Sequence, residues 1–183
     1  MVALRPHKGY DEGANFRTVN CLSDYNRIHQ LDFSALVQEQ GLYAGSTIDI
    51  GSGNCNFLRD LSREFPRMRV TGVDKKNYQA SIPNFIVADA RAIPLPSQQF
   101  DFVVSSIMSQ WIREEPELFY CEVRRLLSPR GVATIFPCTS PTSTLDVIFK
   151  DSYRVRPLTI KDCPSKPLQL FIGNPSFLNK YTS

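Results

Sequence analysis

The chain has 183 residues, of which 42% are hydrophobic and 21% charged, and its formal net charge is +3. These values are typical of one globular domain with its own core, and they exclude a separate substrate domain. No apolar run approaches the roughly 20 residues that a membrane-spanning helix needs, and the first residues lack an apolar leader. We therefore expect a cytoplasmic protein with no membrane partner.

The cysteines and histidines do not suggest a metal site. The five cysteines are odd in number and widely spaced: Cys21, Cys55, Cys121, Cys138 and Cys163. With two histidines, His7 and His29, they make no recognisable zinc spacing. We expect small buried thiols and no bound metal.

Residues 1–35 are predicted to form a helical or flexible cap segment, ahead of a domain that spans residues 36–183. Four apolar residues of this segment are Tyr10, Phe16, Tyr25 and Ile28. They either fold across a ligand site or pad an exposed face of the sheet, and the sequence leaves both interpretations open.

The most informative segment is the turn Asp49-Ile50-Gly51-Ser52-Gly53, which follows a predicted strand at Ser46–Ile50. The helical spacing of Leu58, Leu61 and Phe65 predicts a helix after the turn, and Pro66 ends it. The next predicted strand, Arg69–Asp74, ends on an acid. Glycines let the main chain approach a ligand closely, and a carboxylate at the second strand end can accept both ribose hydroxyls. This combination indicates a nucleotide-containing ligand.

The rest of the chain alternates between strand and helix patterns. We predict strands at 85–88, ending at Asp89, and at 100–105. A helix follows from Pro116, with Pro129 and Gly131 breaking the pattern before a strand at 132–136. A short helix at 145–149 precedes two extended pieces, 153–161 and 168–172, expected to pair antiparallel. The alternation predicts an α/β fold with a mainly parallel sheet, helices on both faces and an antiparallel edge strand.

Five segments, in order between about residues 36 and 173, resemble the class I S-adenosylmethionine-dependent methyltransferases. They are Asp49 to Gly53, Gly72-Val73-Asp74, Val87-Ala88-Asp89-Ala90, residues 93–103 and residues 122–131. Residues 93–103 and 122–131 are similar to the group that mostly methylates small molecules. The resemblance implies a Rossmann-like fold with a seven-stranded sheet, and S-adenosylmethionine as the cofactor, with S-adenosylhomocysteine as its product.

The resemblance also implies roles for particular residues. Gly51 and Gly53 would pass beneath the methionine portion of the donor, with Ser52 and Asn54 supplying amides or side-chain hydrogen bonds. Asp74 would bind the ribose, Asp89 the adenine amino group, and the amide of Ala90 a ring nitrogen. Asp49 would orient the loop or meet the methionine ammonium through water. Further candidates on the same side are Lys75, Ser105 and Ser106 for the cofactor, and Gln110, Trp111, Tyr10 and Phe16 for the substrate pocket.

Simpler interpretations exist for the same residues. Gly51 and Gly53 could serve only as a tight turn, Asp74 and Asp89 only as strand-end caps, and Trp111 only as a core residue. Cys55 stands where many relatives carry a third glycine. Asn56 stands where a dinucleotide-binding turn needs glycine, so an NAD-dependent oxidoreductase is a distant alternative.

The sequence says least about the methyl acceptor. Residues 105–108 read Ser-Ser-Ile-Met, which disfavours base-amine methylation because that group carries an Asn/Asp-Pro-Pro-aromatic motif there. The arginines are expected at the opposite edge of the sheet, next to helix C-termini, so nucleic acid is disfavoured. We expect methyl transfer to an oxygen, nitrogen or carbon of a small molecule, without an identifiable catalytic side chain. A protein substrate and a non-catalytic binding module are the alternatives, and a homodimer or partner subunit could cover the pocket.

Overall fold

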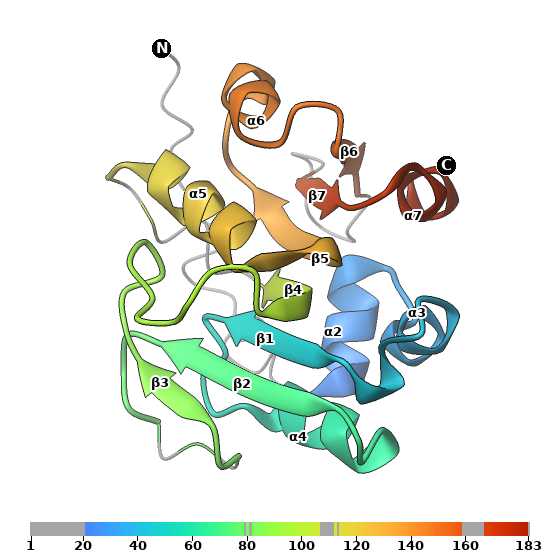
Figure 1. Ribbon diagram of the computed structural model, residues 1–183, viewed down its shortest axis with the longest axis vertical. Coiled ribbons are helices and arrows are strands. Elements are labelled where there is room, and N and C mark those ends of the chain that lie inside the picture. The colour runs from blue at the N-terminus through green and yellow to red at the C-terminus, as the bar shows by residue number, and fades with distance from the viewer. Residues whose placement is uncertain are drawn as a thin grey trace.

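The structure is a computed structural model that describes residues 21–78, 80, 82–106, 112, 114–158 and 167–182. Seven strands form one sheet in the order β3-β2-β1-β4-β5-β7-β6 (Figure 1). Their bounds are β1 Ser46–Ile50, β2 Arg69–Asp74, β3 Phe85–Val87, β4 Phe100–Ser106, β5 Leu127–Cys138, β6 Tyr153–Pro157 and β7 Leu168–Ile172. Strands β1 to β5 run parallel, which confirms the predicted α/β class.

The antiparallel strand does not lie at the very edge of the sheet. Strand β7 pairs antiparallel with β5 on one side and with β6 on the other. The edge strand β6 therefore runs in the same direction as β5. The two extended pieces pair with each other as predicted, and β7 is inserted between β6 and the parallel part of the sheet.

Helices cover both faces of the sheet (Figure 1). Their bounds are α2 Leu22–His29, α3 Phe33–Glu39, α4 Asn56–Glu64, α5 Pro116–Leu126, α6 Thr142–Phe149 and α7 Pro175–Tyr181, with a short 3-10 turn at Leu42–Ala44. Residues of α2, α3, α4 and α7 belong to one buried apolar cluster, and residues of α5 and α6 belong to the other. None of the helices in the described ranges is both long and apolar enough to span a membrane.

Alternation along the strands assigns side chains to the two clusters. In β4, Phe102 and Val104 belong to the first cluster, whereas Val103 belongs to the second. In β7, Phe171 belongs to the first cluster and Leu170 to the second. Successive strand residues point to opposite faces, so a central strand with both faces covered is apolar throughout. This is why β4 and β5 are apolar runs rather than alternating ones.

Two features at the C-terminal side differ from the sequence prediction. Strand β5 begins at Leu127 and not at Val132, because Leu127 already pairs with Phe100 of β4. The residues between Leu127 and Val132 fall in an irregularity of this pairing. Gly131 lies in this irregularity, where a Cβ would come within 2.9 Å of the Phe100 carbonyl oxygen. Helix α7 was not predicted. Its signals were present, because Asn174 caps it by accepting from the Phe177 amide and Pro175 is its first residue.

The boundary expected between residues 35 and 36 falls inside α3. Phe33 and Leu36 are both fully buried in the first cluster, on the two sides of that boundary. Helix α2 lies against α4, the helix that follows the glycine turn. Tyr25 and Ile28 of α2 are buried, so the described part of the N-terminal segment is an integral layer of the domain. Tyr10 and Phe16 lie outside the described residues.

Candidate cofactor-binding site

The glycine turn after β1 is held to the tip of β2 by main-chain hydrogen bonds. The amides of Gly51 and Ser52 both donate to the Val73 carbonyl oxygen, at 2.7 and 3.0 Å. Gly51 has a φ of 83°, which a residue with a Cβ rarely adopts. The expectation that Ser52 offers its amide to the donor is therefore corrected: that amide is used inside the protein, and the side chain is buried.

Gly53 presents a bare stretch of main chain at the outer end of the turn. Its φ is 53°, and a Cβ built at this position would have no heavy atom within 4 Å. The missing side chain therefore leaves open space of the kind that a ligand needs to approach the backbone. Asn54 follows, and its side-chain oxygen accepts from the Asn56 amide at 3.3 Å, at the start of α4.

Asp74 at the end of β2 joins this turn to its own loop. One carboxylate oxygen accepts from the Gly53 amide at 3.0 Å and the other from the Lys76 amide at 3.1 Å. Asp74 therefore caps the turn, which was the alternative interpretation of this residue. This capping does not compete with the ribose role, because each carboxylate oxygen has a second lone pair and the residue is only half-buried.

Asp49 is the most unusual carboxylate of the site, because it is fully buried. One oxygen accepts from the hydroxyl of Tyr25 at 2.7 Å, whereas the other has no hydrogen-bond partner. The pKa of Asp49 is raised to about 7, mainly by burial. The hydrogen bond from Tyr25 lowers this pKa, and the charge of Asp74 raises it. A buried polar atom without a partner is costly, so the unpaired oxygen marks a place that a cationic or hydrogen-bonding ligand group would satisfy.

Cys55 occupies the position of the third glycine in a conformation that suits glycine. Its φ is 63°, and its thiol is buried beside the Ser52 hydroxyl at 3.2 Å. Gly72 of β2 provides the space, since a Cβ there would lie 2.3 Å from the Cys55 sulfur. The side chain that enters the turn at position 55 is therefore accommodated by the absence of one at position 72.

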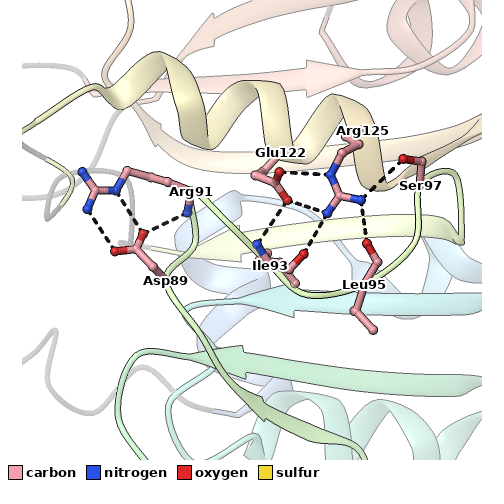
Figure 2. Close-up of polar contacts among 7 residues, drawn as sticks. All are labelled: Asp89, Arg91, Ile93, Leu95, Ser97, Glu122 and Arg125. Atoms are coloured by element: carbon pink, nitrogen blue, oxygen red, sulfur yellow. Dashed lines mark hydrogen bonds and ion pairs between the residues drawn. The ribbon is translucent and has the colours of Figure 1, made fainter.

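Asp89 lies two residues beyond β3 and is paired more strongly than its predicted role implied (Figure 2). Arg91 donates to its two carboxylate oxygens from Nε and Nη2, both at 3.0 Å, and the Arg91 amide adds a third bond of 3.0 Å. Lys75 lies 3.6 Å away. The hydrogen bonds from Arg91 hold the pKa of Asp89 well below its usual range. An adenine amino group would have to share this carboxylate.

Arg91 was absent from the predicted site. A basic residue two positions after an acid at a strand end was the available signal. Its Nη1 also donates to the Glu114 carbonyl oxygen at 3.0 Å, which ties the loop after β3 to the approach to α5. Ala90, between the two charged residues, is half-buried against the second cluster.

The second arginine in Figure 2, Arg125, lies in the last turn of α5, as expected of an arginine next to a helix C-terminus. Arg125 pairs with Glu122 at 2.7 Å and donates to the carbonyl oxygens of Ile93 and Leu95. It thereby fastens the loop that connects β3 to β4. Arg156 also serves helix C-termini: it donates to the carbonyl oxygens of His29 and Tyr181, the last residues of α2 and α7.

The two serines at the end of β4 face different partners. Ser105 is fully buried and donates to the Ile50 carbonyl oxygen at 2.8 Å, so its hydroxyl holds β1 to β4 and does not face the donor. Ser106 lies 2.5 Å from Nε2 of His29 and also shares a hydrogen bond with Tyr25. Gln110 and Trp111, predicted for the substrate pocket, lie outside the described residues.

The described carboxylates and the bare turn lie along the C-terminal edge of β1, β2 and β3, where ligands bind in open α/β sheets. The site fits a nucleoside with a cationic group: Asp74 has capacity for hydroxyls, Gly53 leaves space, and the unpaired oxygen of Asp49 suits an ammonium. These features belong to one continuous strip of the structure.

Comparison with known proteins agrees with this site. Residues 48–135 match the model of the family described as "Methyltransferase domain". Trans-aconitate 2-methyltransferase of Escherichia coli O1:K1 is 32% identical over 94 residues, which cover 48% of this chain and 36% of that protein. The chain therefore matches about a third of the length of these curated relatives.

Two solved structures show the same fold at low identity. A protein of Methanococcus maripaludis assigned to the S-adenosylmethionine-dependent methyltransferases has a TM-score of 0.62 and 18% identity, over 82% of this chain and 86% of that one. A TehB-like methyltransferase of Corynebacterium glutamicum has a TM-score of 0.56 and 18% identity, over 77% and 86%. The order and direction of the strands and the glycine turn with its acids agree with the methyltransferase-domain match over residues 48–135, and the sheet has the Rossmann-like fold of the S-adenosylmethionine-dependent methyltransferases.

Proposed function

We propose that the protein binds S-adenosylmethionine at the C-terminal edge of β1, β2 and β3 and transfers its methyl group to a small-molecule acceptor. The observation that carries the proposal is Asp49. It is a fully buried acid whose second oxygen is unpaired, at the end of β1 beneath a turn with no side chain at Gly53. A protein that bound no cation there would gain nothing from burying this charge.

Each residue of the site is assigned to a different part of the donor. Asp49 receives the ammonium group, either directly or through water, and its charge also suits the positive sulfur. Asp74 binds the ribose hydroxyls with the lone pairs left by its two main-chain bonds. The pair of Asp89 and Arg91 lies at the adenine end. Bound S-adenosylmethionine supplies a sulfonium-activated methyl group, and the chain contributes mainly position and a favourable charge.

A small molecule is the acceptor class with the most support. The curated relatives are named for trans-aconitate, a small acid, although they share only about a third of their length with this chain. Three arginines of the described residues have internal partners: Arg91 binds Asp89, Arg125 binds Glu122, and Arg156 binds main-chain oxygens. Arginines engaged in this way do not form a track for phosphates, so nucleic acid is disfavoured.

The cofactor half of the proposal is tested by calorimetric titration with S-adenosylmethionine, S-adenosylhomocysteine and NAD. Asp74→Ala is expected to weaken donor binding by on the order of 1–3 kcal/mol, because charge-assisted hydrogen bonds are lost. The matched control is Asp151→Ala, which removes an exposed acid just before β6, at the opposite edge of the sheet. Unchanged donor binding by the Asp74 variant would contradict the ribose assignment.

The acceptor half is tested with labelled donor and a cell extract that is separated into metabolite, protein and RNA fractions. We expect the label in the metabolite fraction, and we expect the Asp74 variant to abolish it. Label in the protein fraction would instead establish a protein methyltransferase. Donor binding without label in any fraction, with extracts from several growth conditions, would indicate a non-catalytic binding module.

A further inference from the structure

A line of buried polar side chains crosses the first apolar cluster and ends at Asp49. The residues come from five different elements and are, in spatial order, Arg156, Gln169, His29, Ser106, Tyr25 and Asp49. His29, Gln169 and Asp49 are fully buried, and Tyr25 and Ser106 nearly so. Arg156 is half-buried at the start of the line. Burying the other five polar side chains in succession is costly unless they are hydrogen-bonded, so the direction of each bond is constrained by its neighbours.

The direction is set at the sheet edge by Arg156. Its Nη2 donates to the side-chain oxygen of Gln169, at 3.0 Å, across the pair of strands β6 and β7. An arginine can only donate, so the oxygen of Gln169 must face it and the amide nitrogen must face inward. That nitrogen lies 2.8 Å from the Thr134 hydroxyl and 3.1 Å from Nδ1 of His29.

The Gln169 amide donates toward Nδ1, so the arrangement favours a lone pair on Nδ1 of His29 and the ring proton on Nε2. The Thr134 hydroxyl, 3.2 Å from Nδ1, can donate to the same lone pair. Nε2 then donates to the Ser106 hydroxyl oxygen across 2.5 Å. Since that oxygen is the acceptor, the Ser106 hydrogen is free for the hydroxyl oxygen of Tyr25, with which Ser106 shares a hydrogen bond.

The last bond of the line reaches the candidate site. Tyr25 accepts from Ser106, so its own hydrogen points to Asp49 across 2.7 Å. Every bond therefore runs the same way, from the arginine to the carboxylate. The only free acceptor at the end of this line is the second oxygen of Asp49, which has no partner among the described residues.

We propose that His29 is a positioning residue for donor binding, and that it acts through Ser106 and Tyr25 to hold Asp49 in the hydrogen-bonded, anionic form that receives the cationic end of the donor. The inference rests on the proposed function, because it assigns the support of the Asp49 site. His29 does not act as a general base. It is enclosed by the rings of Tyr25, Phe33 and Phe136, and burial lowers its pKa to about 3, so the ring is neutral.

The first test needs no donor. The chain contains two histidines, His7 and His29, so nitrogen NMR of ring-labelled protein gives a simple spectrum, and His29→Phe assigns it. We expect His29 with a proton on Nε2, an unprotonated Nδ1 and no titration between pH 5 and 8. A proton on Nδ1, or protonation within this range, would overturn the inference because the direction of the line would be reversed or lost.

The second test follows S-adenosylhomocysteine and S-adenosylmethionine affinity against pH. Besides Tyr25, the titratable groups facing Asp49 are Asp74 of β2 and Cys55 before α4. In the wild type the affinity rises with pH as Asp49 ionises. His29→Phe keeps the aromatic shape but removes the bond to Ser106, so Tyr25 supports the anion less. We expect the midpoint of the profile to move to higher pH by on the order of one unit.

Gln169→Glu provides the second variant, in case the first does not fold. A glutamate can only accept from His29, so the proton moves to Nδ1 and Nε2 accepts from Ser106 instead. The line is then reversed without a change of shape, and the midpoint again moves upward. The matched control is Thr47→Val, which removes a buried hydroxyl of β1 whose hydrogen bond goes to Met68, outside the line, so its midpoint stays at the wild-type value.

The outcomes separate the two proposals. Loss of donor binding in Asp49→Asn together with an unshifted midpoint in both line variants overturns the role of His29 and leaves the proposed function standing. A wild type that binds neither compound at any pH overturns the proposed function. An equal shift in Thr47→Val would mean that the midpoint reports general loosening of the core, which would also overturn the role of His29.

Discussion

Asp49 of β1 and Asp89 after β3 lie on the same edge of the sheet, with β2 between their strands, and have opposite surroundings. Asp49 is enclosed by core side chains, has a single hydrogen-bond donor and has a pKa raised to about 7. Asp89 is half-exposed and holds both Arg91 and Lys75, so its pKa is lowered. Asp49 therefore has no cationic partner within the described part of the protein, whereas Asp89 is already paired with two cations. The contribution of a carboxylate to ligand binding thus depends on the charged groups that the protein itself places beside it.

Among the variants that test the contrast between Asp49 and Asp89, Asp49→Asn is expected to have the largest effect. The amide keeps an acceptor for Tyr25 but removes the charge, so donor affinity should fall about 100-fold, or about 2.7 kcal/mol. The unfolding free energy at pH 8 should rise by on the order of 2–4 kcal/mol, because a buried anion is no longer required. Calorimetry and urea unfolding measure the two quantities. A loss of both affinity and stability would contradict the assignment of Asp49 as a ligand-directed charge.

The next effect concerns packing beneath the turn. Gly72→Ala should lower the unfolding free energy by about 2–3 kcal/mol, since the new Cβ would meet the Cys55 sulfur and the Ser52 hydroxyl, at 2.3 and 2.8 Å. Adding Cys55→Gly should recover at least half of that loss in thermal and urea unfolding. Gly53→Ala is the contrasting variant: its Cβ faces open space, so only the left-handed backbone, about 1 kcal/mol, opposes it. Additive losses at positions 72 and 55 would show that the two residues are not coupled.

The pH dependence sharpens the electrostatic side of the contrast. Donor affinity should rise up to about tenfold per pH unit below pH 7 and level off above it, as Asp49 ionises, and the slope should vanish in Asp49→Asn. Stability responds in the opposite sense at this residue. A raised pKa contributes stability below about pH 4, which is lost as pH rises through 7, whereas the lowered pKa of Asp89 contributes stability that is lost in acid. A flat affinity profile from pH 5.5 to 8.5 would refute the role of Asp49.

The smallest effect is expected from Asp89→Asn. Because Arg91 already occupies this carboxylate, donor affinity should fall by no more than about fivefold, far less than for Asp49→Asn. Calorimetry at two salt concentrations checks this, with Arg91→Ala as the partner variant. A loss as large as that of Asp49→Asn would show that the adenine end contributes as much as the buried acid, and the comparison would no longer hold.

Much of the fold could be predicted from local patterns. The bounds of β1 and β2 and the helix after the glycine turn followed from short apolar runs, Gly51, Gly53 and Pro66, because these signals are local in the sequence. The start of β5 was wrong because pairing with β4 overrides the breaking signals of Pro129 and Gly131. The role of Ser52 was wrong because a main-chain bond to Val73, on another strand, is invisible to sequence spacing.

By itself the sequence determined the α/β class, the position of the glycine turn and the acids Asp49, Asp74 and Asp89 at strand ends, since periodicity and turn chemistry act over a few residues. Only the tertiary structure decided the ionisation of these acids and which of their oxygens lack a hydrogen-bond partner. Burial, the pairing of Arg91 with Asp89 and the line from Arg156 through His29 to Asp49 join residues up to 140 positions apart, such as His29 and Gln169. A pKa depends on the charges and the solvent within a few ångströms, and only folding brings those groups to that distance.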